Sequence, residues 1–148
     1  MIRLTKMTDY ALVLMALMAR RPGDAPFAAR DLAESTGIPL PMVSKILKAL
    51  AREEFLRSTR GANGGYSLAR DPAEINVARL IERLEGPVAL TECATHTDSG
   101  CTIEGNCPVS SPLQRINRVV IETLAGITLE ELAEPEGAKL ARRWRQQA

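Results

Sequence analysis

The order of sequence patterns between residues 29 and 69 constrains the fold most strongly. A short helical segment, ARDLAES, is followed by a tight turn at Gly37 and by a second helical segment that begins near Pro41 and runs to about Glu53. Apolar residues in the second segment recur at the spacing of one helix face, at Val43, Ile46, Leu47 and Leu50. Two helices joined by a short glycine-containing turn indicate a helix-turn-helix.

A glycine-rich reversal follows the second helix directly. Leu56–Thr59 and Tyr66–Ala69 have the character of two short strands. Asn63, Gly64 and Gly65 between them tolerate the positive φ that a tight reversal needs. Because a β-hairpin in this place is the wing of a winged helix, the sequence predicts a mainly α winged helix-turn-helix with a two-stranded wing.

The first helical segment is apolar on nearly all sides. It is predicted to run from Thr8, as the capping residue, to about Arg21, with ALVLMALMA at its centre. This run is too short to span a bilayer, and Asp9 before it and the arginines after it do not fit a secretion signal. A helix of this kind is buried on several sides, and we expect that a second subunit supplies part of this burial. We expect a soluble cytoplasmic protein with no membrane partner.

Helical patterns return after the wing. The segment from Asn76 to Glu85 is apolar on one face and is predicted to close the core of the N-terminal part. A long helix is predicted to begin with a cap at Ser110, to carry Pro112 in its first turn and to end at Gly126. Its apolar stripe consists of Leu113, Ile116, Val119, Val120 and Leu124. The capping-box sequence TLEE then predicts one more short helix.

Charge is distributed unevenly, although the net charge is only +1. Residues 1–85 carry 13 Lys/Arg against 10 Asp/Glu, whereas residues 86–138 carry 2 against 8. A basic N-terminal part suits contact with a polyanion. We divide the chain into a winged-helix DNA-binding domain at 1–85, a cysteine-rich loop at 86–108, the long helix with its short capping helix at 109–134, and a basic tail at 135–148.

The second helix and the wing carry groups that suit DNA. Lys45 and Lys48 share a helix face that can meet phosphates or base edges, with Ser44 beside them. Arg60 in the wing suits a bidentate or minor-groove contact, and the neighbouring glycines let the backbone approach a duplex closely. Either element alone would equally fit a solvated surface, but their order favours DNA binding. The candidate contacts are Ser44, Lys45, Lys48, Arg60, Asn63, Gly64 and Gly65.

The stretch LTECATHTDSGCTIEGNCP contains every cysteine of the chain, Cys93, Cys101 and Cys107, and the single histidine, His96. The spacing lacks the paired C-x2–4-C knuckles of structural zinc sites. Three thiolates on a glycine-containing loop can hold an iron–sulfur cluster, which needs four ligands. Unligated cysteines would be scattered over core faces. The pattern favours a metal or cluster and leaves iron–sulfur and zinc both open.

The residues leave the fourth ligand open as well. His96 lies in the same loop, although a lone histidine is more often a solvent-exposed residue. Asp9 is the competitor, although an acid in the first turn of a helix is explained by the helix dipole. A single histidine, no phosphate-binding loop and no evident carboxylate pair argue against an enzyme and against a small-molecule substrate.

Several segments together resemble one known family. MIRLTKMTDYAL, STGIPLPMVSKILKAL, RGANGGYSL, the three-cysteine loop and SSPLQRINRVVIETLAGITLEEL resemble the winged-helix regulators that include the iron–sulfur assembly regulator IscR and the nitric-oxide sensor NsrR. The resemblance covers residues 1 to about 134. It implies a homodimer on operator DNA, with the long helix as the dimerisation helix. It also implies an iron–sulfur cluster near the dimer interface, which we expect to be 2Fe–2S rather than 4Fe–4S.

The resemblance also assigns residues. Cys93, Cys101 and Cys107 fall where the family binds its cluster, and Pro39, Pro41, Ser44, Lys45 and Arg60 fall where it contacts DNA. The histidine that follows the last cysteine in IscR is absent here, where Pro108 follows Cys107. The start of the chain around Asp9 is similar to that of NsrR, in which the partner subunit's aspartate completes the cluster. Asp9 is therefore favoured over His96.

The whole pattern is most similar to regulators of SUF-system iron–sulfur assembly. We therefore expect a cluster-controlled repressor of iron–sulfur assembly genes. A nitric-oxide-sensing repressor and a zinc-stabilised DNA-binding module are the alternatives.

Overall fold

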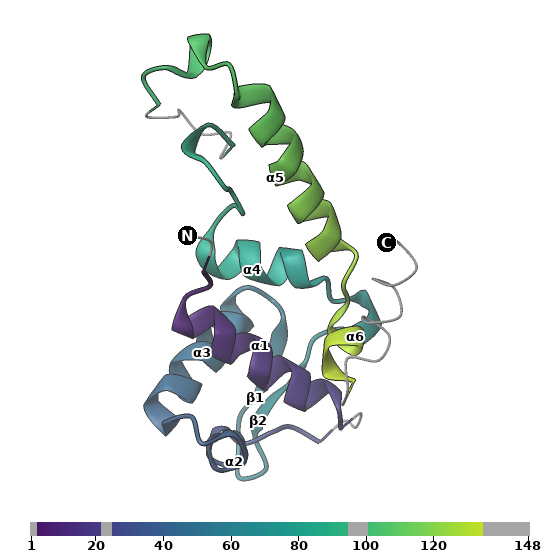
Figure 1. Cartoon of the computed structure of the whole chain (residues 1–148). Helices are drawn as coiled ribbons and strands as arrows, with labels where there is room; N and C mark the ends of the chain where they lie inside the picture. Colours follow the sequence, from purple (N-terminus) through teal and green to yellow (C-terminus); the bar gives the residue numbers. More distant parts are fainter. Residues whose placement is uncertain (1–2, 22–24, 95–100, 135–148) are drawn as a thin grey trace.

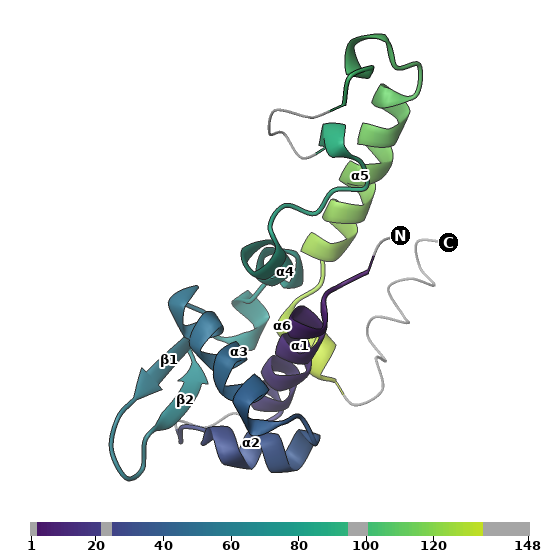
Figure 2. The same ribbon diagram turned by 90° about the vertical axis from the view of Figure 1, so that its left-hand side faces the viewer.

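The structure is a computed structural model that describes residues 3–21, 25–94 and 101–134. A body at one end contains helices α1 (Lys6–Ala19), α2 (Ala29–Thr36), α3 (Leu40–Arg52) and α4 (Val77–Glu85) and strands β1 (Leu56–Thr59) and β2 (Gly65–Leu68). Helix α5 (Ser110–Ala125) projects away from this body, and α6 (Leu129–Ala133) returns to it (Figures 1 and 2). Within the described ranges, no helix has the length and apolarity needed to cross a membrane.

The core of the body is aliphatic and lies between α1, α3 and α4. The inward face of α3 consists of the residues expected from their spacing, and Val43, Ile46, Leu47 and Leu50 are all 0% exposed. Leu14 from α1 and Leu80 from α4 meet them and are equally inaccessible. Strands β1 and β2 pair antiparallel, with Leu56 opposite Leu68. The predicted winged helix-turn-helix with a two-stranded wing is confirmed.

We call helix α5, together with the cysteine loop before it, the arm. Helix α6 belongs to the body and not to this arm. Leu129 is fully buried, and its N–H donates to Ile75 O at 2.8 Å. Arg20 Nε on α1 also reaches Ala133 O at 2.7 Å. The division at residue 109 grouped α6 with the long helix, whereas the structure packs it on α1. The expected capping box is present, with Thr128 and Glu131 bonded reciprocally.

The first helix starts one turn earlier than its sequence pattern predicts. Thr5 is the N-cap, and its hydroxyl accepts a hydrogen bond from Thr8 N at 3.3 Å. Thr8, the expected cap, is instead 1% exposed inside the helix. Thr5 and Thr8 lie one helical turn apart, and each is of a residue type that caps helices. Only the burial of Thr8 inside the helix shows that Thr5 is the cap. Val13 on the outer face of α1 remains 45% exposed.

The glycines of the wing act differently from the prediction. The positive φ lies at Gly61, at 115°, and not within residues 63–65. Gly64 and Gly65 are instead needed because other backbone segments pass so close to them that a side chain would not fit. A Cβ on Gly64 would lie 2.3 Å from Thr59 O, and one on Gly65 would lie 2.4 Å from Phe27 O. The second approach allows an isolated antiparallel bridge between Phe27 and Tyr66, which fastens the wing to the segment before α2.

Gly65→Ala is therefore expected to lower the free energy of unfolding by roughly 1–3 kcal/mol, the usual range for forcing a group into filled space. The added methyl must displace Phe27 O and break the bridge to Tyr66. Urea unfolding measures the loss. Gly105→Ala is the matched control, because a Cβ there meets nothing within 4 Å. Equal midpoints for the two variants would contradict this role of Gly65.

Candidate nucleic-acid interface and cysteine loop

The outer face of α3 presents its basic side chains to solvent. Pro41, Lys45, Lys48 and Arg52 are all exposed and follow one another at helical spacing, while Ser44 beside them is half-buried. Arg52 Nε is bonded to the Glu53 carboxylate at 3.2 Å. Among the described residues no ion pair engages either lysine. Two unengaged ammonium groups on one face can meet phosphates or base edges.

The wing lies beside α2, at the end of the body remote from the tip of α5 (Figure 2). Arg60 follows β1 directly, and both Arg60 and Asn63 are exposed. The strand adds Arg57, which is exposed while its neighbour Leu56 is buried. Sequence reasoning missed Arg57, although alternation along the strand placed it opposite the core face. Pro39, the N-cap of α3, is also exposed at the turn between the helices.

The cysteines lie along the arm rather than in the body. Cys93 is in a short 3-10 turn, η2 (Glu92–Ala94), and Cys107 follows another, η3 (Glu104–Asn106). All three cysteines are free and half-buried, and Cys93 Sγ lies 3.2 Å from Thr91 Oγ1. Across residues 3–21, 25–94 and 101–134, no three histidine, cysteine or acidic side chains form a metal-binding group. His96 lies outside the described residues.

Asp9 occupies the first turn of α1, where its side chain is exposed. Its backbone N–H donates to Thr5 O at 3.0 Å, as expected in a first turn. Within the described part of the chain, the carboxylate has no hydrogen-bond or ion-pair partner. An exposed, unpaired carboxylate at this place is available to a second molecule.

Asn117 fastens the start of the cysteine loop to α5. It is only 4% exposed, its Oδ1 accepts from Leu90 N at 3.0 Å, and its Nδ2 donates to Val88 O at 3.4 Å. A buried amide is stable when hydrogen-bonded in this way. Sequence reasoning missed Asn117, although a polar residue between Ile116 and Val120 in an amphipathic helix was a visible signal.

Glu85, the last residue of α4, joins the root of the loop to α1. Its Oε1 accepts a hydrogen bond from Thr5 N at 2.6 Å, and Gly86, with a φ of 93°, begins the loop. Partial burial raises the pKa of this carboxyl, but hydrogen bonding from Thr8 and Thr5 outweighs it, so the pKa of Glu85 is lowered. The stability that this contact adds is therefore fully present above the ordinary carboxyl pKa and is lost as the pH falls through the lowered value.

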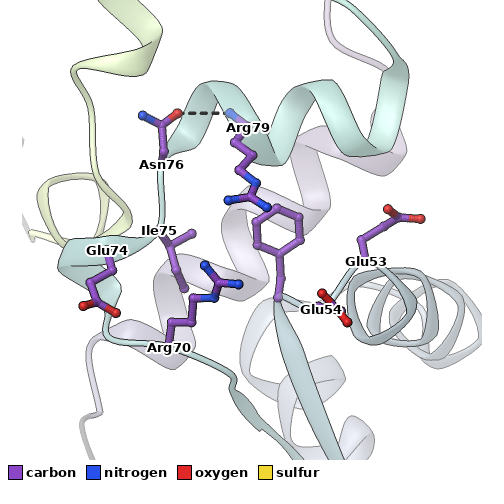
Figure 3. Close-up of a pocket in the computed structure, with 8 residues that line it drawn as sticks. Glu53, Glu54, Arg70, Glu74, Ile75, Asn76 and Arg79 are labelled. Atoms are coloured by element: carbon purple, nitrogen blue, oxygen red, sulfur yellow. Dashed lines mark hydrogen bonds between the residues drawn. The ribbon is translucent and has the colours of Figure 1, made fainter.

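A shallow pocket lies where the end of α3, the root of the wing and the start of α4 meet (Figure 3). Its volume is about 370 Å³ including the open mouth. Charged side chains of both signs surround it, namely Glu53, Glu54, Arg70, Glu74 and Arg79. Glu53 ties the two helices together, because its carboxylate meets Arg52 on α3 and, at 3.5 Å, Arg83 on α4. The pocket is a packing junction, and we assign it no ligand.

The winged helix with its projecting arm has known relatives. Residues 4–135 match the model of the Rrf2 family, which is described as an iron-dependent transcriptional regulator. The chain belongs to the Rrf2 family. The repressor NsrR of Streptomyces coelicolor is 33% identical over 140 residues, which make up 93% of each chain. The family resemblance stated from the sequence motifs is confirmed.

Solved structures of Rrf2-like regulators share the fold. CymR, described as the global cysteine regulator of B. subtilis, superposes with a TM-score of 0.71 and 26% identity over 90% of this chain and 97% of its own. IscR from T. potens superposes with a TM-score of 0.68 and 26% identity, over 93% and 90%. The Rrf2 protein described here is thus a DNA-binding transcriptional regulator and not an enzyme.

Proposed function

We propose that this Rrf2 protein is a homodimeric repressor whose affinity for operator DNA is controlled by an iron–sulfur cluster. Its targets would be genes of iron–sulfur cluster assembly. The observation that carries the proposal is the position of the cysteines. All three lie in the loop that joins the winged-helix body to the projecting helix α5. A change in the conformation of this loop would affect both the body and α5.

The exposed face of α5 supports a dimer of this chain. Ile116 and Val119 are 51% and 60% exposed, and Val109 just before the helix is 51% exposed. With 16 residues, α5 is about 24 Å long and stands clear of the body (Figure 1). A continuous apolar stripe of this kind marks an interface. A second copy of α5 would cover it with a matching stripe.

The donor set fits an iron–sulfur cluster. Cys93, Cys101 and Cys107 would supply three thiolates and the partner subunit's Asp9 the fourth ligand, with His96 as the alternative. When bound, the cluster supplies iron–thiolate bonds that respond to redox agents and reactive gases at this loop. A carboxylate is a harder and weaker ligand for iron than a thiolate. The bond between iron and the Asp9 carboxylate would therefore be the first to be replaced. Two irons and two sulfides per subunit are expected, as in 2Fe–2S.

The chain itself would carry the response to DNA. The loop begins at the end of α4 and is fastened to α5 by Asn117, so its order affects how α5 meets its partner. The pairing of the two α5 helices sets the separation of the two α3 helices. The spacing of the two half-sites on DNA is fixed. A small shift in the populations of dimers with a matching and a non-matching separation of the α3 helices therefore changes the operator affinity. Proposed DNA contacts are Pro39, Pro41, Ser44, Lys45, Lys48, Arg60, Asn63, Gly64 and Gly65.

The α3 contacts are testable through salt dependence. Replacing both Lys45 and Lys48 by alanine removes two phosphate contacts in each subunit and about four in the dimer, each worth a slope of about 0.9 in log affinity against log salt. We expect a slope whose magnitude is smaller by about 3.6 and an affinity at least about tenfold lower at moderate salt. Fluorescence anisotropy with operator DNA measures both. Arg118→Ala, on the exposed side of α5 that faces away from the apolar stripe, is the control. An unchanged slope in the double variant would rule out these contacts.

Nitric-oxide sensing is the second candidate function. It is favoured by the match, over 93% of both chains, to the NsrR repressor of Streptomyces coelicolor. Titrating the cluster-loaded protein with nitric oxide while measuring operator affinity separates the two candidates. A change in operator affinity at stoichiometric nitric oxide favours nitric-oxide sensing. A change in operator affinity only when the cluster is gained or lost favours control of iron–sulfur assembly genes.

Zinc binding is tested by colour. Protein purified without oxygen would be brown or red with visible charge-transfer bands if the loop holds an iron–sulfur cluster. It would be colourless if the loop holds zinc.

A further inference from the structure

The N-terminus of α1 is held by a carboxylate from a residue 80 positions away. Thr5 N donates to Glu85 Oε1 at 2.6 Å, and Thr5 also caps the helix through its hydroxyl. The Thr5 hydroxyl in turn lies 3.3 Å from the buried Thr8 hydroxyl. These three residues form one polar network. Glu85 therefore adds a second hydrogen bond at the place where helix α1 begins.

The two ends of this network lead to the two parts of the proposed cluster site. On one side, Gly86 follows Glu85 and opens the cysteine loop. On the other side, Asp9 follows Thr8, and its own N–H is bonded to Thr5 O. Asp9 is exposed toward solvent, so a displacement of the first turn of α1 moves this carboxylate directly.

We infer that Glu85 is a positioning residue that couples the two cluster sites of the dimer through the Thr5–Thr8 turn. The inference rests on the proposed function, in which each loop takes its fourth ligand from the partner subunit's Asp9. Loss of order in one loop releases Glu85 from Thr5, and the first turn of α1 in the same subunit loosens. The Asp9 of that subunit then no longer reaches the other cluster, so the second cluster is lost more readily than the first.

This coupling has a direct readout in the population of half-loaded dimers. If the two sites are independent, about half of the dimers hold one cluster when total occupancy is one half. If the sites are coupled as described, the half-loaded population is several-fold smaller. Native mass spectrometry of partly depleted full-length protein counts the three species. At half occupancy, a change in the stability of the fold that acts equally on both sites does not change the ratio of empty, half-loaded and fully loaded dimers. The half-loaded population therefore reports coupling specifically.

The test compares wild type with Glu85→Ala, which removes the acceptor for Thr5 N. We expect few half-loaded dimers in wild type and the statistical half in Glu85→Ala. Glu85→Gln keeps an acceptor oxygen without its charge and is expected to lie between them. It also serves as the second variant if the alanine variant folds poorly. Glu82→Ala, an exposed carboxylate one turn earlier in α4, is the control and is expected to behave as wild type.

Amide hydrogen exchange supplies an independent measure at Thr5, Thr8 and Asp9. In wild type, exchange at these amides is expected to be about tenfold faster without the cluster than with it, and in Glu85→Ala fast in both forms. Wild-type protein that binds no cluster would overturn the proposed function together with this inference. Coupling that survives in Glu85→Ala, or statistical half-loading in wild type, would overturn the inference and leave the proposed function standing.

Discussion

The double variant Ile116→Glu, Val119→Glu is expected to be a monomer with operator affinity lower by about two orders of magnitude or more. Both side chains are more than half exposed on the free α5, so the substitutions leave the folded monomer undisturbed. In the dimer the new carboxylates would be buried without partners, which costs several kcal/mol. A monomer also binds only one half-site and loses the benefit of two linked contacts. Sedimentation velocity and fluorescence anisotropy measure the two effects.

Ser111→Glu is the matched control for this variant. It adds a carboxylate to α5 at an exposed position that, at 3.6 residues per turn, lies on the opposite side from Ile116. The control is expected to remain a dimer with unchanged operator affinity. If the double variant stays dimeric, the stripe on α5 is not the interface.

Cys107→Ser is expected to remove the cluster entirely, which is the second large effect. A serine hydroxyl is a poor ligand for iron beside thiolates, and two remaining cysteines cannot hold a cluster that needs four ligands. The visible absorbance and the iron and sulfide content of protein purified without oxygen should fall to background. Replacing Cys93 or Cys101 should do the same. The half-buried positions of all three tolerate serine, so the fold should persist by circular dichroism.

The fourth ligand follows from the same measurement on two more variants. Asp9→Ala is expected to keep the fold, to shift the visible spectrum and to lower cluster occupancy. His96→Ala is expected to change neither. An unchanged spectrum and occupancy in Asp9→Ala would exclude Asp9 as a ligand. The opposite pair of results would assign the ligand to His96.

Local patterns predicted the body of the fold. The spacing of Val43, Ile46, Leu47 and Leu50 determines the buried face of α3, and the glycine turn before it determines the helix-turn-helix. These features depend on neighbours within a few residues, which sequence periodicity records directly. The candidate DNA contacts and cluster ligands follow from the same local patterns and from the family resemblance, and they stay predictions.

Contacts between distant residues could not be predicted in this way. Gly65 is required by Phe27 O, Asn117 holds a segment 27 to 29 residues before it, and Glu85 caps a helix 80 residues away. In each case the reason for the residue lies in a partner that only the folded chain brings near. The packing of α6 on the body could not be predicted for the same reason, because it depends on Leu129 and Ile75 meeting across the chain.

The central claim is that an iron–sulfur cluster controls operator binding. The most direct test is the operator affinity of one wild-type preparation at one salt concentration, measured with the cluster bound and again after its removal without oxygen. We expect the two affinities to differ by about tenfold or more, within the usual range of coupling between two sites. The Cys107→Ser variant should match the cluster-free value. Two affinities that agree within about twofold would contradict the account, because a cluster without differential binding shifts no equilibrium.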